Sequence, residues 1–108
     1  MSPTDPPEGE MAALSRIAVT IANIYADRFG TPRDAGWVLH KLTEETGELT
    51  GAWLQHTGQG RREASVVDLA DELSDVLGFL LVFSDRAGID AAAALREKWG
   101  AHLPREPE

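Results

Sequence analysis

The sequence lacks cysteine, lacks any long apolar run and is poor in basic residues. The absence of cysteine among its 108 residues excludes disulfides, thiolate zinc sites and a cysteine nucleophile. No stretch reaches the ~18 apolar residues that would predict a membrane-spanning helix. No basic segment followed by an apolar one stands at the start, so no signal peptide is expected. Together these absences predict a soluble protein, with the cytoplasm as its expected location.

The charge balance is strongly acidic. Ten basic residues stand against 18 acidic ones, which gives a formal net charge of −8. This balance disfavours a nucleic-acid backbone or an anionic membrane as a partner, because both repel an acidic protein. It is compatible with a cation-binding site, although many acidic proteins have none. The length predicts a single domain with a single core.

Apolar residues recur at helical spacing in four segments, and no segment alternates in the manner of a strand. Asp34 and Asp90 are suited to cap two helices at their N-termini, while Gly30 and Gly88 are suited to end two helices. We therefore predict an all-α fold, with the helices packed as a four-helix bundle. The helices are expected over residues 10–30, 35–58, 66–88 and 91–103.

The third expected helix is apolar around most of its circumference, in particular over "VLGFLLVF". A chain of this size can hardly cover such a helix on all sides. We therefore expect subunits to pack together, as a homodimer or homotetramer. The helical domain is expected to span residues 9–103, between a proline-rich tail at residues 1–8 and a short tail at residues 104–108.

Carboxylates are concentrated beside the apolar faces of two expected helices. In "KLTEETGEL", Glu44, Glu45 and Glu48 share one side of a helical wheel, and Glu45 lies nearest to the apolar face. In "DLADELSD", Glu72 and Asp75 again border an apolar stripe. If the two helices pack antiparallel through their apolar faces, both acidic stripes line one groove. Several carboxylates without matching lysine or arginine suit a hard cation, Mg²⁺ or alternatively Mn²⁺.

The same pattern also has a simpler explanation. Glutamate is a strong helix former, and most carboxylate pairs on amphipathic helices are solvated. A helical interaction module without catalysis, whose acidic stripes are solvated or hold a structural cation, is therefore an alternative.

The motif "EETGE" followed by "DELSD" resembles the E-E-x-x-E … E-x-x-D signature of the MazG-like all-α nucleoside triphosphate pyrophosphohydrolases. In this chain 23 residues separate Glu48 from Glu72, which fits the short spacer of that family, and the likeness covers about residues 34–99. The resemblance implies an enzyme that uses Mg²⁺ to convert a (d)NTP and water into a (d)NMP and pyrophosphate, in house-cleaning of the nucleotide pool. The same resemblance would also fit a regulatory homologue that binds nucleotides but does not hydrolyse them.

The resemblance also implies roles for the five acidic residues. Glu45, Glu48, Glu72 and Asp75 would bind the Mg²⁺. Glu48 is expected to act in catalysis as well as in metal binding. Glu44 either supports the metal ligands or acts as the base that orients the attacking water.

Trp37, Lys41 and Lys98 are the candidates for contacts with the substrate. Trp37 shares the carboxylate side of its helix and would stack on a base, whereas large aromatics on helices more often fill a core. Lys41 precedes the glutamates by one turn and either pairs with them or binds phosphate. Lys98 is a phosphate ligand by family likeness, or else a solvated charge. Arg61 and Arg62 are expected to lie in an ordinary solvated connection, with binding of substrate phosphates in the same or a neighbouring subunit as the alternative.

Overall fold

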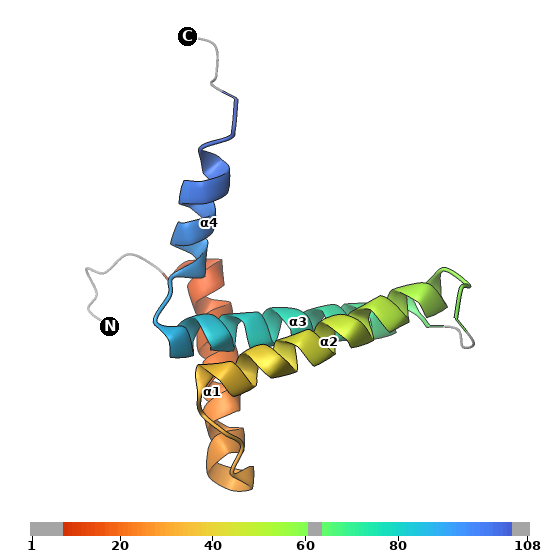
Figure 1. Ribbon diagram of the computed structural model, residues 1–108, viewed down its shortest axis with the longest axis horizontal. Helices are drawn as coiled ribbons and strands as arrows, with labels where there is room; N and C mark the ends of the chain where they lie inside the picture. Colours follow the sequence, from red (N-terminus) through yellow and green to blue (C-terminus); the bar gives the residue numbers. More distant parts are fainter. Residues whose placement is uncertain (1–7, 61–63, 105–108) are drawn as a thin grey trace.

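The computed structural model describes residues 8–60 and 64–104, and within these ranges every regular element is a helix. The all-α prediction is confirmed, and the helices begin where the sequence predicts them. The last helix ends earlier than expected, at Gly100 rather than near residue 103. The four helices are α1 (Glu10–Phe29), α2 (Ala35–His56), α3 (Val66–Ala87) and α4 (Ala91–Gly100) (Figure 1).

Side-chain caps fix where three of the helices begin. The Asp34 carboxylate accepts a hydrogen bond from the backbone N–H of Trp37 at 2.8 Å, and Asp90 caps α4 in the same way. Both predicted aspartate caps are therefore confirmed. At the start of α3, Ser65 and Asp68 each accept a hydrogen bond from the backbone N–H of the other, which forms a capping box.

Two glycines fix where α1 and α3 end. Gly30 and Gly88 follow these helices with φ of 68° and 71°, in the left-handed region that glycine adopts without steric cost. Both were expected as helix-ending residues, and both predictions are confirmed.

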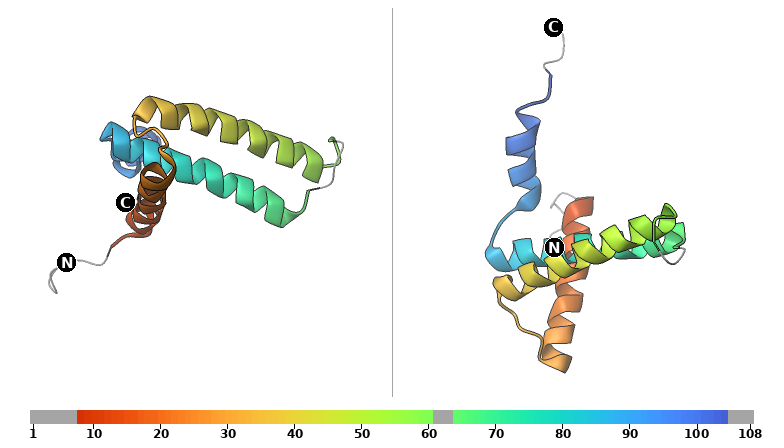
Figure 2. Two further views of the ribbon diagram at one scale, coloured as in Figure 1. Left: turned by 90° about the horizontal axis from the view of Figure 1, so that it is seen from below. Right: turned by 45° about the vertical axis from the view of Figure 1, so that its right-hand side comes forward.

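The helices α2 and α3 lie side by side and antiparallel along most of their lengths (Figure 2). The helix α1 crosses this pair near the start of α2 and the end of α3 (Figure 1). The helix α4 points away from the other three. One chain thus packs three helices around a small core and does not close a four-helix bundle by itself. The buried apolar residues of this core are Ala26, Val38, Ala52, Leu81 and Val82.

The surface of α3 is only partly covered within one chain. Leu81 and Val82 are buried, whereas Leu73, Leu77 and Leu80 are exposed. The expectation that one chain leaves apolar surface of this helix uncovered is therefore met. Among the described residues, no helix combines the length and the apolar character needed to cross a membrane.

Some predictions fall on residues that the structure does not describe. Arg61 and Arg62 lie outside the described ranges, as do the two predicted tails apart from Glu8 and Pro104. Glu8 forms an ion pair of 2.9 Å with Arg16 of α1.

Candidate metal centre

Three carboxylates from two helices converge on one point between α2 and α3. Glu45 comes from α2, and Glu72 and Asp75 come from α3. One oxygen of each lies within 4.8 Å of one oxygen of the other two. They meet because the antiparallel packing of α2 and α3 sets the middle of one helix against the middle of the other. The structure thus brings together three of the four predicted metal ligands.

Two oxygens of this acidic cluster, defined as Glu45, Glu72 and Asp75, are buried without a partner. Glu45 is only 9 % exposed to solvent. Within the described residues, Oε2 of Glu45 and Oε2 of Glu72 have no hydrogen-bond partner. A buried carboxylate oxygen without a partner is costly, because it loses hydration without replacement. Such a pair of oxygens is the arrangement expected where a cation supplies the missing interaction.

The electrostatics of the cluster agree with this interpretation. Burial raises the pKa of Glu45 most, and with the contributions of the neighbouring carboxylates of Glu48 and Asp75 the pKa reaches about 7. Burial also raises the pKa of Glu72, again with contributions from Glu48 and Asp75. Without a cation these groups hold protons more tightly than ordinary carboxyls do. A divalent ion would displace those protons, so metal affinity should increase with pH.

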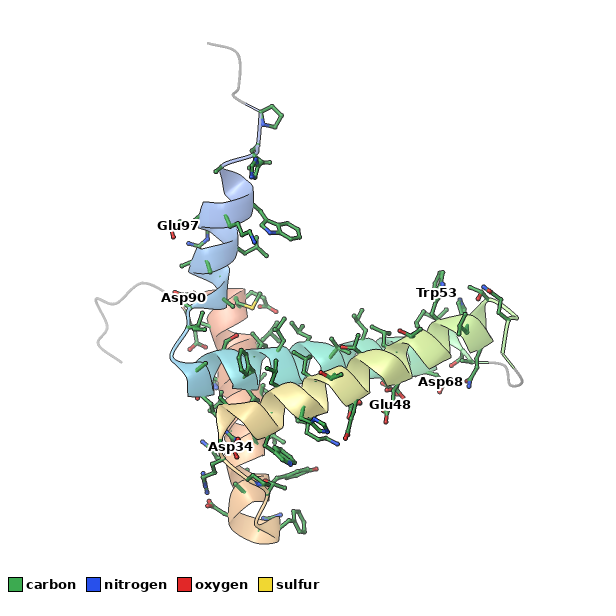
Figure 3. The ribbon with its side chains drawn as sticks, in the orientation of Figure 1. Asp34, Glu48, Trp53, Asp68, Asp90 and Glu97 are labelled. Carbon is green, nitrogen blue, oxygen red and sulfur yellow. The ribbon has the colours of Figure 1, made fainter. Side chains whose placement is uncertain are left out.

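Glu48, the fourth predicted ligand, lies at the edge of the cluster. It is exposed, and it is not one of the three residues whose oxygens lie within 4.8 Å of one another. It is nevertheless close enough to raise the pKa of both Glu45 and Glu72. Figure 3 shows it midway along α2, between Asp34 at one end of the helix and Trp53 near the other.

Glu44 points to a different partner. Its Oε2 accepts a hydrogen bond from Lys41 Nζ at 2.9 Å, and its Oε1 lies 3.7 Å from Nε2 of His40. The hydrogen bond from Lys41 lowers the pKa of Glu44, and the same bond raises the pKa of Lys41. A carboxylate with a lowered pKa is a weak proton acceptor, so this geometry disfavours Glu44 as a general base. For Lys41 the structure shows the ion pair with Glu44, which was one of its two expected roles.

An apolar groove adjoins the acidic cluster. It has a volume of about 550 Å³ and lies between α1 and the α2–α3 pair. Trp37 of α2 lines it, and Ser74 and Asp75 of α3 lie on its wall, so Asp75 belongs to both the groove and the cluster. Trp37 is half-buried. It therefore lies where it would contact a molecule that occupies the groove and reaches the carboxylates.

Lys98 is not brought to the acidic cluster within one chain. It lies on α4, where it lines a shallow depression with Trp99 and His102. Figure 3 shows its neighbour Glu97 on the projecting helix, remote from Glu48. Within one chain, the position of Lys98 therefore agrees with a solvated charge and not with a phosphate ligand at the cluster.

Sequence reasoning missed the groove itself. The helical spacing of apolar residues predicted a helix over residues 10–30 but gave no sign that part of its apolar face would remain open. Arg86, which also lines the groove, donates a hydrogen bond to the Pro32 carbonyl at 3.1 Å and so ties the end of α3 to the α1–α2 connection. Arg86 and Pro32 are 54 positions apart in the sequence, so no local sequence pattern predicts their contact.

Comparison with known protein families, curated proteins and solved structures found no match to this chain. The case for a function therefore rests on the site and on the motif that forms it.

Proposed function

We propose that this protein is a Mg²⁺-dependent nucleoside triphosphate pyrophosphohydrolase, which converts a (d)NTP and water into a (d)NMP and pyrophosphate. The observation that carries the proposal is the acidic cluster, in which two buried carboxylate oxygens have no partner among the described residues. The resemblance of "EETGE" and "DELSD" to the signature of MazG-like enzymes supports the same function, because the cluster is built from these two motifs.

The residues present fit a hard divalent cation. The donor atoms are all carboxylate oxygens, which Mg²⁺ and Mn²⁺ prefer over the nitrogen and sulfur ligands typical of zinc. Glu45, Glu72 and Asp75 would hold the ion, and Glu48, whose carboxylate raises the pKa of Glu45 and Glu72, is the fourth candidate ligand. Bound Mg²⁺ would neutralise charge on the phosphates and polarise them toward attack.

The remaining groups have roles that their positions allow. Glu48 is exposed at the edge of the cluster, so its carboxylate would accept a hydrogen bond from the attacking water and orient that water. The water oxygen then bonds to phosphorus while the bond from phosphorus to the leaving phosphate oxygen breaks. Trp37 would stack on the base in the groove, an interaction worth about 1–3 kcal/mol. Lys41 would exchange its bond to Glu44 for a phosphate oxygen.

One observation favours a second candidate, a non-catalytic helical module that binds a cation in its acidic groove. Lys41 is already paired with Glu44, and Lys98 is remote from the cluster within one chain. A triphosphate requires cationic partners beyond a single metal ion, and the described part of one chain supplies few of them at this site. A structural cation would require none.

Release of pyrophosphate from a panel of nucleoside triphosphates distinguishes the two candidates. Wild type should release pyrophosphate with Mg²⁺ or Mn²⁺ and not with EDTA, and Asp75→Asn should not release it. Glu97→Gln is the matched control, because it makes a similar neutralising change on α4, away from the cluster (Figure 3). If no triphosphate yields pyrophosphate at micromolar wild-type protein with either metal, the enzymatic function is wrong and the module is favoured.

A further inference from the structure

Arg86 is the one cationic side chain among the described residues that line the apolar groove. It lies in the last turn of α3 and is half-buried. Its Nη1 donates a hydrogen bond to the Pro32 carbonyl at 3.1 Å, which holds the guanidinium in place. This bond uses one of the five N–H donors that an arginine carries. The proposed reaction gives this cation no role.

Arg86 and Asp75 lie on the same face of α3. Arg86 follows Asp75 by about three helical turns, or about 16 Å, and at about 100° per residue the two directions differ by only about 20°. Gly78 and Val82 line the groove between them. The floor that α3 provides is therefore apolar, with a carboxylate of the acidic cluster toward one end and a guanidinium toward the other.

Trp37 lies on the α2 side of the groove, toward the Arg86 end. Because α2 and α3 are antiparallel and Glu45 meets Asp75, the part of α2 before Glu45 runs beside the part of α3 after Asp75 (Figure 2). Trp37 precedes Glu45 by about two turns, so it lies about 12 Å along the helix from the cluster. A base stacked on Trp37, with its phosphates at the cluster, would direct the edge remote from its sugar toward Arg86.

That edge is where the bases differ in one exocyclic group. Guanine, uracil and thymine carry a carbonyl oxygen there, which accepts hydrogen bonds, whereas adenine and cytosine carry an amino group, which donates them. A guanidinium has donors and no acceptor. A half-buried arginine therefore bonds the carbonyl group, and it leaves donors facing each other without a partner when the amino group is present.

The other polar side chains of the groove discriminate less between the two groups. Ser74 Oγ already donates to the Asp71 carbonyl at 2.7 Å. The hydroxyls of Thr31 and Tyr25, which also line the groove, can each donate or accept, so they suit a carbonyl and an amino group alike. Discrimination at this edge therefore falls to Arg86.

We propose that Arg86 determines the base specificity of this protein by donating hydrogen bonds to the exocyclic carbonyl of guanine, uracil or thymine. Nucleotides of these keto bases are then preferred over those of adenine and cytosine. The inference rests on the proposed function, since it takes a nucleotide as the occupant of the groove. The bond to Pro32 fixes the guanidinium before a nucleotide binds, which lowers the entropic cost of the contact.

Relative turnover of matched nucleotides is the first test, measured as pyrophosphate release with Mg²⁺. The pairs dGTP with dATP and dUTP with dCTP each contrast a carbonyl with an amino group. Wild-type kcat/KM should be at least about 5-fold higher for the keto member, the lower end of the discrimination that a good arginine–base contact gives. Arg86→Met, which keeps an unbranched stem without donors, should remove the preference. The control Arg96→Met, on α4, should keep it.

The ratio within each pair separates a base reader from a residue that only ties Pro32 to α3. Loss of the tie alone would lower stability and slow turnover of every nucleotide by the same factor. Unchanged ratios in Arg86→Met would therefore overturn the inference, as would a wild type that prefers amino bases or does not distinguish the pairs. In each of these cases pyrophosphate release itself would still support the proposed function.

Calorimetric titration with GMP and with AMP tests the same contact without turnover. Wild type should bind GMP at least about 5-fold more tightly than AMP, and Arg86→Met should bind both alike. These titrations decide the matter if no triphosphate is hydrolysed. A preference for GMP that is lost in Arg86→Met would then uphold the base reader although the enzymatic function is wrong. Equal binding of the two, or no binding of either, would overturn the inference as well.

Discussion

The acidic cluster and the apolar groove share Asp75, yet they lack different kinds of partner. In the cluster charge is uncompensated, because Glu45 is buried beside other carboxylates. In the groove charge is not the problem, and apolar side chains such as Ile17 and Ile21 remain exposed to water. The first deficiency is one that a small ion relieves. The second requires protein surface or an apolar ligand.

The comparison also shows why the two regions have to be tested separately. A variant of the cluster should change activity and metal response and leave assembly intact. A charged substitution on the exposed apolar surface should change the predicted oligomeric state first. Any substitution that changes both equally would argue that the two regions are not distinct.

The largest effect is expected on turnover. Glu72→Gln and Glu48→Gln should each lower the rate of pyrophosphate release by at least about 100-fold, a loss typical of removing one group that stabilises the transition state. Steady-state rates at saturating Mg²⁺ provide the measurement, and light scattering should show an unchanged mass. Either variant retaining half of the wild-type rate would exclude that residue from the site.

A smaller effect is expected on stability in the absence of divalent cations. Glu45→Gln should unfold at a higher urea concentration than wild type at pH 8, since it removes a carboxylate whose ionised form is disfavoured by burial and by like-charged neighbours. Urea titrations in EDTA measure this. A loss of more than about 1 kcal/mol on substitution would mean that the Glu45 carboxylate is a structural group rather than a site for an ion.

The starts of the helices and the position of the acidic cluster could be predicted from the sequence. Asp34 and Gly88 are local signals, because a cap or a left-handed turn depends on a few neighbouring residues. The convergence of Glu45 with Glu72 required only that two amphipathic helices pack antiparallel. The projection of α4 and the open groove could not be predicted in this way, since they depend on how α1 crosses the other helices.

The roles within the acidic motif were also only partly predictable. Helical spacing allowed Lys41 to pair with Glu44 or Glu45 but gave no reason to prefer Glu44 over Glu45 as its partner. The structure supplies that reason in the 2.9 Å hydrogen bond between Lys41 and Glu44. Distinguishing a ligand from an ion-paired neighbour depends on side-chain rotamers, which periodicity does not determine.

The stability of the cation-free protein should depend on pH through the cluster. The pKa of Glu45 in the folded chain, about 7, lies above its ordinary value of 4.5. The stabilising proton is fully present below pH 4.5 and is lost as the pH rises through 7, so the free energy of unfolding should fall across this interval. The slope from one proton is at most about 1.4 kcal/mol per pH unit. Unfolding in EDTA at several pH values measures it, and Glu45→Gln should lack this component. Parallel profiles for the two proteins would contradict the assignment.

The smallest effect is expected from the exposed ion pair. Lys41→Met should lower the free energy of unfolding only slightly, because the bond to Glu44 lies at the surface and is screened by water. Its effect on turnover separates the two roles of Lys41. A rate unchanged at saturating substrate, with an unchanged KM, would show that Lys41 only pairs with Glu44, whereas a raised KM is expected if it binds phosphate.

The binding of Mg²⁺ at the acidic cluster is tested most directly by the melting temperature with and without millimolar Mg²⁺. A ligand that binds only the folded state stabilises it by mass action, by about 2.7 kcal/mol at one hundred times its Kd. Wild type and the control Glu97→Gln should both melt at a higher temperature with Mg²⁺, while Glu72→Gln and Asp75→Asn should show no shift. Equal shifts in all four proteins would show that these carboxylates do not hold the metal.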